Sequence, residues 1–185
     1  MSEPIKNLGV LLDCSRNAVM KPECLRSFVD LIAKMGYSSL QLYTEDTYTV
    51  DGEELFGYQR GRYTKEELKE IDSYCAERGV ELIPCIQVLA HMNQITRYSR
   101  YWPIIDCQDI LLAGEEKTYA FLDKVFATLE ECFTSKTVNI GMDEAHMVGR
   151  GQYIKYHGYR DRAEIIAEHL ERVHEIANKH GFKIM

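Results

Sequence analysis

Short apolar runs alternate along this chain with longer segments whose apolar residues recur at helical spacing, and few folds are compatible with that alternation. Apolar runs of this length are typical of buried strands, and the segments between them have the spacing of amphipathic helices. The predicted strands cover residues 8–12, 39–43, 80–88, 137–141 and 182–185. The predicted helices lie around residues 25–35, 64–77, 122–129 and 166–177. Strand and helix are thus expected to alternate from end to end.

Specific residues mark the ends of these helices. Thr64 and Glu67 match a capping box, in which the Thr64 hydroxyl accepts from the amide three residues on and Glu67 reaches back to the amide of Thr64. Gly36, Gly79 and Gly181 each stand where a residue in the left-handed conformation ends a helix, and a strand begins almost at once. The links that lead into strands are therefore short.

The links that follow strands are long. About twenty residues follow Tyr43, more than twenty follow Val88, and nearly twenty follow Gly141. Loops gathered at the carboxyl ends of strands are how (β/α)8 barrels build their active sites. An open doubly wound sheet also binds ligands there, but no Gly-x-Gly-x-x-Gly motif follows the first strand. A barrel is the favoured interpretation.

The length of the chain limits how much of a barrel it can form. A complete barrel has eight units and about 250 residues, whereas these 185 residues supply four units and the start of a fifth. We expect one domain over residues 1–185, an α/β fold that is a partial (β/α)8 TIM barrel and looks truncated. Its two unpaired sheet edges favour self-association as a homo-oligomer.

Composition excludes some partners. The 22 basic and 29 acidic residues give a net charge of −7, which disfavours nucleic acid and anionic membrane surfaces. No apolar run approaches the ~18 residues of a membrane span, and MSEPIKNLG has no apolar stretch of the kind a secretory signal needs. We expect a cytoplasmic protein. Its six cysteines form no CxxC pair and are interpreted as reduced thiols.

The adjacent acids Asp143 and Glu144 directly follow the fourth predicted strand. Two like charges at a strand end raise the pKa of one of them, so that one acid could donate a proton while the other stays ionised. Both can reach one ligand only if the backbone bends there, and Gly141 permits a bend. The alternative is an acidic pair that interacts with the dipole at a helix N-terminus.

Polar residues also follow the other strands. Arg16 follows the first strand and could bind sugar hydroxyls or a carboxylate, or form a salt bridge with Asp13. Glu45 and Asp46 follow the second strand, either as ligand-binding acids or as solvated loop charges. His91 follows the third strand, where a single histidine could equally be structural. Together these positions predict a polar site at one end of the sheet.

Four segments carry a resemblance to a known family: GVLLDCSRN, LYTEDTY, LIPCIQVLAHMN and VNIGMDEAH. In order and spacing they are similar to the first half of the catalytic barrel of glycoside hydrolase family 20, the β-N-acetylhexosaminidases. The chain looks closest to the compact intracellular branch of that family. The Asp-Glu pair after a glycine-containing strand is the most specific of the shared elements.

The resemblance implies a reaction. Such enzymes remove terminal N-acetylglucosamine or N-acetylgalactosamine with retention of configuration, using the substrate's own acetamide as the nucleophile. Glu144 would be the general acid and base, and Asp143 would orient the 2-acetamido group. Neither a metal nor an organic cofactor is implied.

The resemblance also implies residues for substrate binding. Arg16 matches an arginine that binds sugar hydroxyls, and His91 matches a histidine that supports the acid through a polar relay. Glu45 and Asp46 stand where the family usually has two aspartates. The tryptophans and the acetamido-contacting tyrosine of the family belong to the second half of the barrel and are absent from this sequence, so the chain alone is expected to be inactive.

Two other functions stay open. A metal-dependent sugar isomerase or hydrolase would use Glu144, Asp143, His91 and Glu45 as ligands of a divalent ion, although no HxH or HExxH spacing supports it. A scaffold that binds sugar weakly or only assembles is the non-enzymatic alternative. Sensitivity to a chelator would identify the first, and a turnover assay would separate an enzyme from the second.

Overall fold

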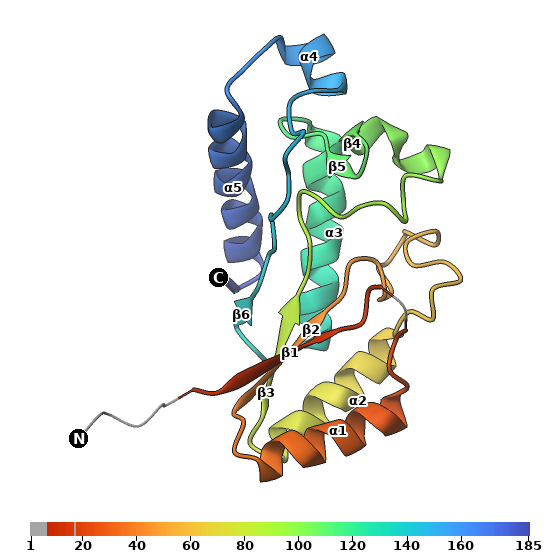
Figure 1. The fold of residues 1–185 in the computed structure, drawn as a ribbon, viewed down its shortest axis with the longest axis vertical. Coiled ribbons are helices and arrows are strands. Elements are labelled where there is room, and N and C mark those ends of the chain that lie inside the picture. The colour runs from red at the N-terminus through yellow and green to blue at the C-terminus, as the bar shows by residue number, and fades with distance from the viewer. Residues whose placement is uncertain (1–6, 17) are drawn as a thin grey trace, which may run out of the picture.

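The computed structural model describes residues 7–16 and 18–185, and a parallel β-sheet lies at its centre (Figure 1). The strands of this sheet region are β1 (Gly9–Asp13), β2 (Ser39–Tyr43), β3 (Glu81–Cys85), β6 (Thr137–Val138) and β7 (Lys183–Ile184). β1, β2 and β3 pair in that order, and β6 pairs with β7. An isolated parallel bridge between Cys85 and Asn139 connects the two groups. The strands therefore follow one another in sequence order, with their carboxyl ends at one edge.

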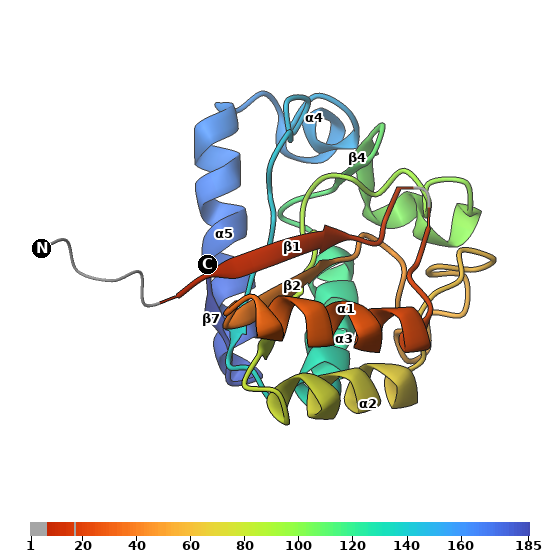
Figure 2. The same ribbon diagram turned by 60° about the horizontal axis from the view of Figure 1, so that its bottom comes forward.

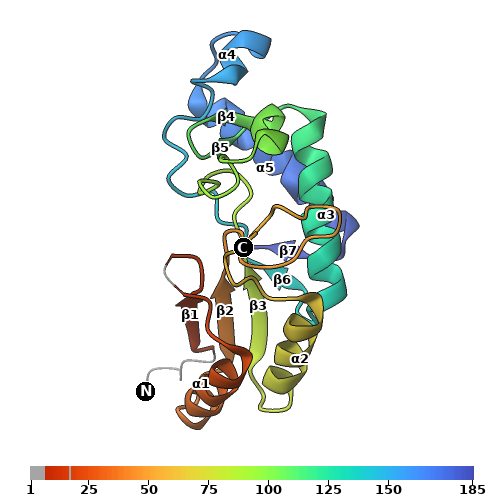
Figure 3. The same ribbon diagram turned by 90° about the vertical axis from the view of Figure 1, so that its right-hand side faces the viewer.

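Four long helices cover the sheet: α1 (Pro22–Lys34), α2 (Lys65–Ala76), α3 (Glu116–Cys132) and α5 (Arg162–Lys179). α1 packs against α2, α2 against α3, and α3 against α5. Figure 2 shows α1 and α2 side by side on one side of β1 and β2, and Figure 3 shows the three first strands side by side. The core lies between strands and helices, and Leu40 and Leu42 of β2 belong to the same buried cluster as Leu25 and Val29 of α1, all at most 1% exposed.

The predicted helix ends are confirmed. Thr64 caps α2 by accepting from the Glu67 amide, and the Glu67 carboxylate accepts from the Thr64 amide, which completes the capping box. Gly36, Gly79 and Gly181 have φ values of +85°, +68° and +76°, the left-handed conformation expected at these positions. Local chemistry therefore sets where these helices begin and end.

β3 and β6 each end three residues earlier than predicted. β3 ends at Cys85 instead of residue 88, and the next backbone N–H, that of Ile86, is donated to the backbone oxygen of Asn139. β6 ends at Val138 instead of residue 141, where Gly141 turns the backbone to φ +69°. Both chain segments leave the sheet early and enter the loops that carry the polar residues.

The long links contain short elements that the sequence did not predict. After β3 come a 3-10 helix (Ser99–Ile104) and a hairpin of β4 (Ile105–Cys107) and β5 (Ile110–Leu111), and after β6 comes α4 (Gln152–His157). Asp106 holds these two links together. Its buried carboxylate accepts from the backbone N–H groups of Gly149 (2.7 Å), Gly151 (3.1 Å) and Tyr153 (2.8 Å). The loop after β6 is thereby fixed to the hairpin.

Two further predictions concern the whole chain. No helix of the described part is long and apolar enough to cross a membrane. Residues 1–6, on which part of the prediction about a secretory signal rests, lie outside the described residues. All six cysteines are free thiols, and burial raises the pKa of Cys75 to about 12. A thiol with that pKa stays protonated at neutral pH and is a poor nucleophile.

Candidate active site

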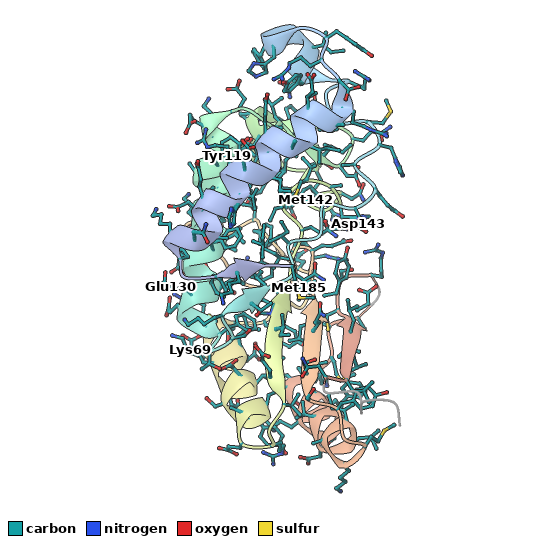
Figure 4. All side chains as sticks on the ribbon, turned by 90° about the vertical axis from the view of Figure 1, so that its left-hand side faces the viewer. Lys69, Tyr119, Glu130, Met142, Asp143 and Met185 are labelled. Carbon is teal, nitrogen blue, oxygen red and sulfur yellow. The ribbon has the colours of Figure 1, made fainter. Side chains whose placement is uncertain are left out.

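The acidic pair lies in a bent segment directly after β6. Gly141, Met142 and Glu144 all have positive φ values, +69°, +76° and +55°. This is the bend expected at Gly141, and it breaks the alternation that would send adjacent side chains to opposite faces. Figure 4 shows Met142 and Asp143 beyond the carboxyl ends of β1–β3. The Asp143 and Glu144 carboxylates both come close to the same histidine.

That histidine is His91, in the loop after β3. It is 8% exposed, and its backbone also has a positive φ, +60°. Its Nε2 lies 3.4 Å from Asp143 Oδ2 and 3.8 Å from Glu144 Oε2, while its Nδ1 lies 3.8 Å from Glu45 Oε1. Among the described residues Nε2 has no hydrogen-bond partner. His91 therefore stands between three carboxylates with one buried ring nitrogen facing the acidic pair.

Arg16 and Glu45 form the opposite side of the site. The Arg16 guanidinium pairs with the Glu45 carboxylate and not with Asp13, which was the alternative partner. It also donates to Ser15 Oγ (2.9 Å) and lies 5.6 Å from the centre of the Tyr43 ring. Burial raises the pKa of Glu45 despite the arginine. Half of the Arg16 side chain stays exposed (51%), so the guanidinium can still meet a ligand.

Asp46 is turned away from this cluster. It is 4% exposed, and its carboxylate pairs with Arg60 Nε at 3.2 Å. The same Arg60 donates to the backbone oxygen of Ser15. Burial raises the pKa of Asp46. Asp46 therefore holds Arg60, which ties the loop after β2 to the loop after β1, whereas its neighbour Glu45 faces the site.

Gln87 and Tyr43 also belong to the site, although no sequence pattern gave them a role there. The Gln87 amide donates to Asp143 and to the Tyr43 hydroxyl, which in turn donates to Glu45. The hydrogen bond from Gln87 lowers the pKa of Asp143, and burial raises the pKa of Tyr43 to about 12. The available signal was that Gln87 is the one polar side chain in the apolar run 82–90.

A pocket opens between these loops. Its lining residues are Ser15, Arg16, Glu45, His91, Asn93, Gln94, Asp109, Glu144 and His146. All nine are polar, so the pocket offers hydrogen-bonding groups from every loop that lines it. Within residues 7–16 and 18–185, no three His, Cys, Asp or Glu side chains are arranged so that they could hold a metal ion.

A comparison with protein families decides how this site is interpreted. The model of glycosyl hydrolase family 20, catalytic domain, matches residues 46–185. The chain belongs to this family. The family 20 match includes His91, Asp143 and Glu144, while Arg16 and Glu45 precede it.

Curated β-hexosaminidases support this assignment. A β-hexosaminidase of Akkermansia muciniphila is 30% identical over 167 residues, which are 74% of this chain and 34% of that protein. β-Hexosaminidase 3 of Arabidopsis thaliana is 25% identical over 193 residues, covering 96% of this chain and 36% of that protein. The chain therefore spans about a third of the length of these relatives.

Solved structures share the fold. The Streptomyces plicatus β-hexosaminidase mutant D313A in complex with its product GlcNAc superimposes with a TM-score of 0.78 at 23% identity, covering 95% of this chain and 38% of that one. The family 20 exo-β-N-acetylglucosaminidase of Vibrio harveyi gives a TM-score of 0.81 at 18% identity, covering 97% and 35%. At these identities the comparison establishes a mixed α/β fold of the family 20 type.

Proposed function

We propose that this chain contributes the catalytic acid region of a β-N-acetylhexosaminidase, and that its sheet is the first part of a (β/α)8 barrel. The proposal rests on one observation above all: a bent backbone brings Asp143 and Glu144 to the same histidine, at the carboxyl ends of parallel strands. Membership of family 20 and similarity to curated β-hexosaminidases support it. The substrate is a glycoside with a terminal N-acetylglucosamine or N-acetylgalactosamine.

In this proposal the two acids have different roles. Glu144, which lines the pocket, protonates the glycosidic oxygen as the C1–O bond breaks. The acetamide oxygen of the substrate forms the new bond to C1, giving an oxazolinium ring and the free alcohol. Asp143, whose pKa is lowered by Gln87, stays ionised, accepts from the acetamide N–H and stabilises the positive charge. Glu144 then takes a proton from the water that reopens the ring.

The surrounding residues bind the substrate and orient the two acids. Arg16 keeps an exposed guanidinium for sugar hydroxyls while Glu45 holds it in place. His91 supports Glu144 and Asp143 from its buried position. In this proposal Glu45 completes the site rather than Asp46. The Glu45 carboxylate lines the pocket and lies 3.8 Å from His91 Nδ1, whereas Asp46 is not among the lining residues.

The general acid is tested by Glu144→Gln in the full-length protein. We expect turnover of a natural glycoside to fall by roughly 10²- to 10⁴-fold, and less for a substrate with a good leaving group, which needs little protonation. Glu171→Gln, an exposed position on α5, is the matched control and should leave turnover unchanged. Near wild-type cleavage of natural glycosides by Glu144→Gln would show that another group is the acid.

Substrate assistance is tested by varying the substrate. Activity should require the 2-acetamido group, and a thiazoline analogue of the oxazolinium intermediate should inhibit far more strongly than the product sugar. A chelator should have no effect. Equal cleavage of plain glucosides would contradict the mechanism, and loss of turnover with a chelator would support the metal-dependent alternative.

A further inference from the structure

A buried glutamine lies against the acidic pair. Gln87 is 3% exposed and follows the last residue of β3 by two positions. Its Nε2 donates to Asp143 Oδ1 (2.7 Å) and to Tyr43 Oη (3.1 Å), and its Oε1 accepts from the backbone N–H of Met142 (3.2 Å). One amide thus connects the end of β2 with the loop after β6.

The contact with Met142 determines which way the amide faces. A backbone N–H can only donate, so the amide oxygen must face Met142 and the NH₂ group must face the other two partners. Asp143 Oδ1 is therefore an acceptor, which favours its ionised form. Tyr43 Oη also accepts from Gln87, so its own proton is directed to Glu45 Oε1 at 3.1 Å.

The loop is shaped to admit this amide. A Cβ at Gly141 would lie 2.4 Å from Gln87 Oε1 and 2.7 Å from Nε2, closer than such atoms approach in proteins. Gly141 therefore serves two purposes, since it also adopts φ +69° in the bend that presents the acids. The fit between Gln87 and Gly141 is a close approach that no other residue at 141 would allow without movement.

We propose that Gln87 is a positioning residue, which orients the Asp143 carboxylate, holds it ionised and links it through Tyr43 to Glu45. The role of Asp143 in binding the acetamide rests on the proposed function, whereas the hydrogen bonds and charge state do not. A glutamine suits this task because its NH₂ group donates to two acceptors at once and carries no charge of its own.

Other groups also act on Asp143. His91 Nε2 faces its second oxygen at 3.4 Å, and Glu144 is its neighbour in the chain. The hydrogen bond from Gln87 is nevertheless the largest cause of the lowered pKa of Asp143 and outweighs the effect of His91. A change made at Gln87 leaves these other groups in place, so a shift in the titration of Asp143 can be assigned to the amide.

The test is an NMR titration of the 185-residue chain labelled with ¹³C at the aspartate carboxyl, with Asp143 assigned from Asp143→Asn. We expect the midpoint of Asp143 to rise by about one pH unit in Gln87→Met, which fills the same space without an amide. Gln41→Met is the matched control, because Gln41 on β2 accepts from Asn139 Nδ2 and donates to no carboxylate in the described part of the chain. An unchanged midpoint in folded Gln87→Met would overturn the proposal.

Two further measurements keep the test decisive. Gln87→Glu retains the side-chain length but sets a carboxylate against Asp143, so the midpoint should rise further as the pair shares a proton. In the unmodified chain the ¹⁵N resonance of the Gln87 amide should titrate with the midpoint of Asp143. If it does not, the proposal fails even when neither variant folds.

The titration requires no turnover and is therefore independent of the proposed function. If the full-length protein hydrolyses no N-acetylhexosaminide while Gln87 still controls the titration of Asp143, the proposed function fails and the positioning role stands. If hydrolysis is found, the low-pH limb of the pH profile of kcat/KM should shift to higher pH in Gln87→Met, by the same amount as the NMR midpoint. An acid limb that stays in place in an active Gln87→Met would also contradict the proposal.

Discussion

His169 on α5 is fully buried, and each of its ring nitrogens makes a hydrogen bond. Nε2 donates to the backbone oxygen of Val88 (2.9 Å), so in the neutral ring Nδ1 accepts from the Tyr119 hydroxyl (3.3 Å). The Gly114 amide donates to that hydroxyl in turn. Burial lowers the pKa of His169 to about 4. A single neutral side chain thereby joins α5, α3 and the loop after β3.

The stability of the protein should therefore depend on the protonation of His169. Between about pH 6.5 and pH 4 the unfolded chain binds this proton and the folded chain does not, so the free energy of unfolding should decrease as the pH falls through that range. Because of His169 alone, the free energy of unfolding should fall by about 3 kcal/mol between the two ends of this range. Urea unfolding at several pH values measures it.

A matched pair of variants isolates the effect. His169→Gln can donate to Val88 and accept from Tyr119 but does not titrate, so its pH profile should be flatter than that of the unmodified protein. His174→Gln, an exposed position on the same helix, should keep the original profile. Parallel profiles for His169→Gln and the unmodified protein would contradict the assignment, because all other groups titrate in both.

The loop after β6 shows how one element is held in an unfavourable backbone conformation. Gly141 must combine a positive φ with a close approach to Gln87, whereas Gly79, which ends α2, has almost the same φ. Apart from its own chain neighbours, no described residue comes within 4 Å of the position that a Cβ at Gly79 would take. The two glycines therefore separate the cost of backbone conformation from the cost of a steric clash. Asp106 fixes the far end of the same loop through three backbone N–H groups.

Alanine substitutions at these two glycines should differ in size. Gly79→Ala should destabilise the protein by about 1 kcal/mol, the cost of a left-handed alanine. Gly141→Ala should cost roughly 1–3 kcal/mol more, because Gln87 must be displaced, and it should also raise the midpoint of Asp143. Thermal unfolding measures the destabilisation, and the NMR titration of the aspartate carboxyl groups measures the midpoint of Asp143. Equal destabilisation by the two substitutions would show that the contact with Gln87 is not a constraint.

At the scale of the whole molecule, the sheet has two open edges. Within the described residues β1 pairs only with β2, and β7 pairs only with β6. Leu11 on β1 is 51% exposed and Met185 after β7 is 58% exposed. Unpaired parallel edges with apolar side chains expose backbone groups that favour pairing with another chain.

We propose that the 185-residue chain self-associates through these edges, most simply as a two-fold dimer. Light scattering should give a mass above 21.4 kDa that increases with concentration. Leu11→Lys should shift the chain towards monomer, because it places a charge on the edge strand. Leu31→Lys, equally exposed on α1, should not. A monomer at every concentration would refute this assembly.

Local interactions allowed much of the fold to be predicted. The capping box of Thr64 and Glu67 and the left-handed Gly36, Gly79 and Gly181 involve residues close in the chain, so the sequence alone determines them. The same holds for the alternation of strands and helices, which follows from the spacing of apolar residues. The placement of polar residues after each strand also indicated where the site lies, because parallel strands end at one edge.

The composition of the site depended on contacts between distant segments. Adjacent residues such as Glu45 and Asp46 leave the backbone in different directions, and the pairing of Asp46 with Arg60 leaves Glu45 to face His91. The hydrogen bond between Gln87 and Asp143 joins residues that are 56 positions apart. No local pattern specifies such contacts, since they exist only when packing of the whole sheet has fixed the paths of its loops.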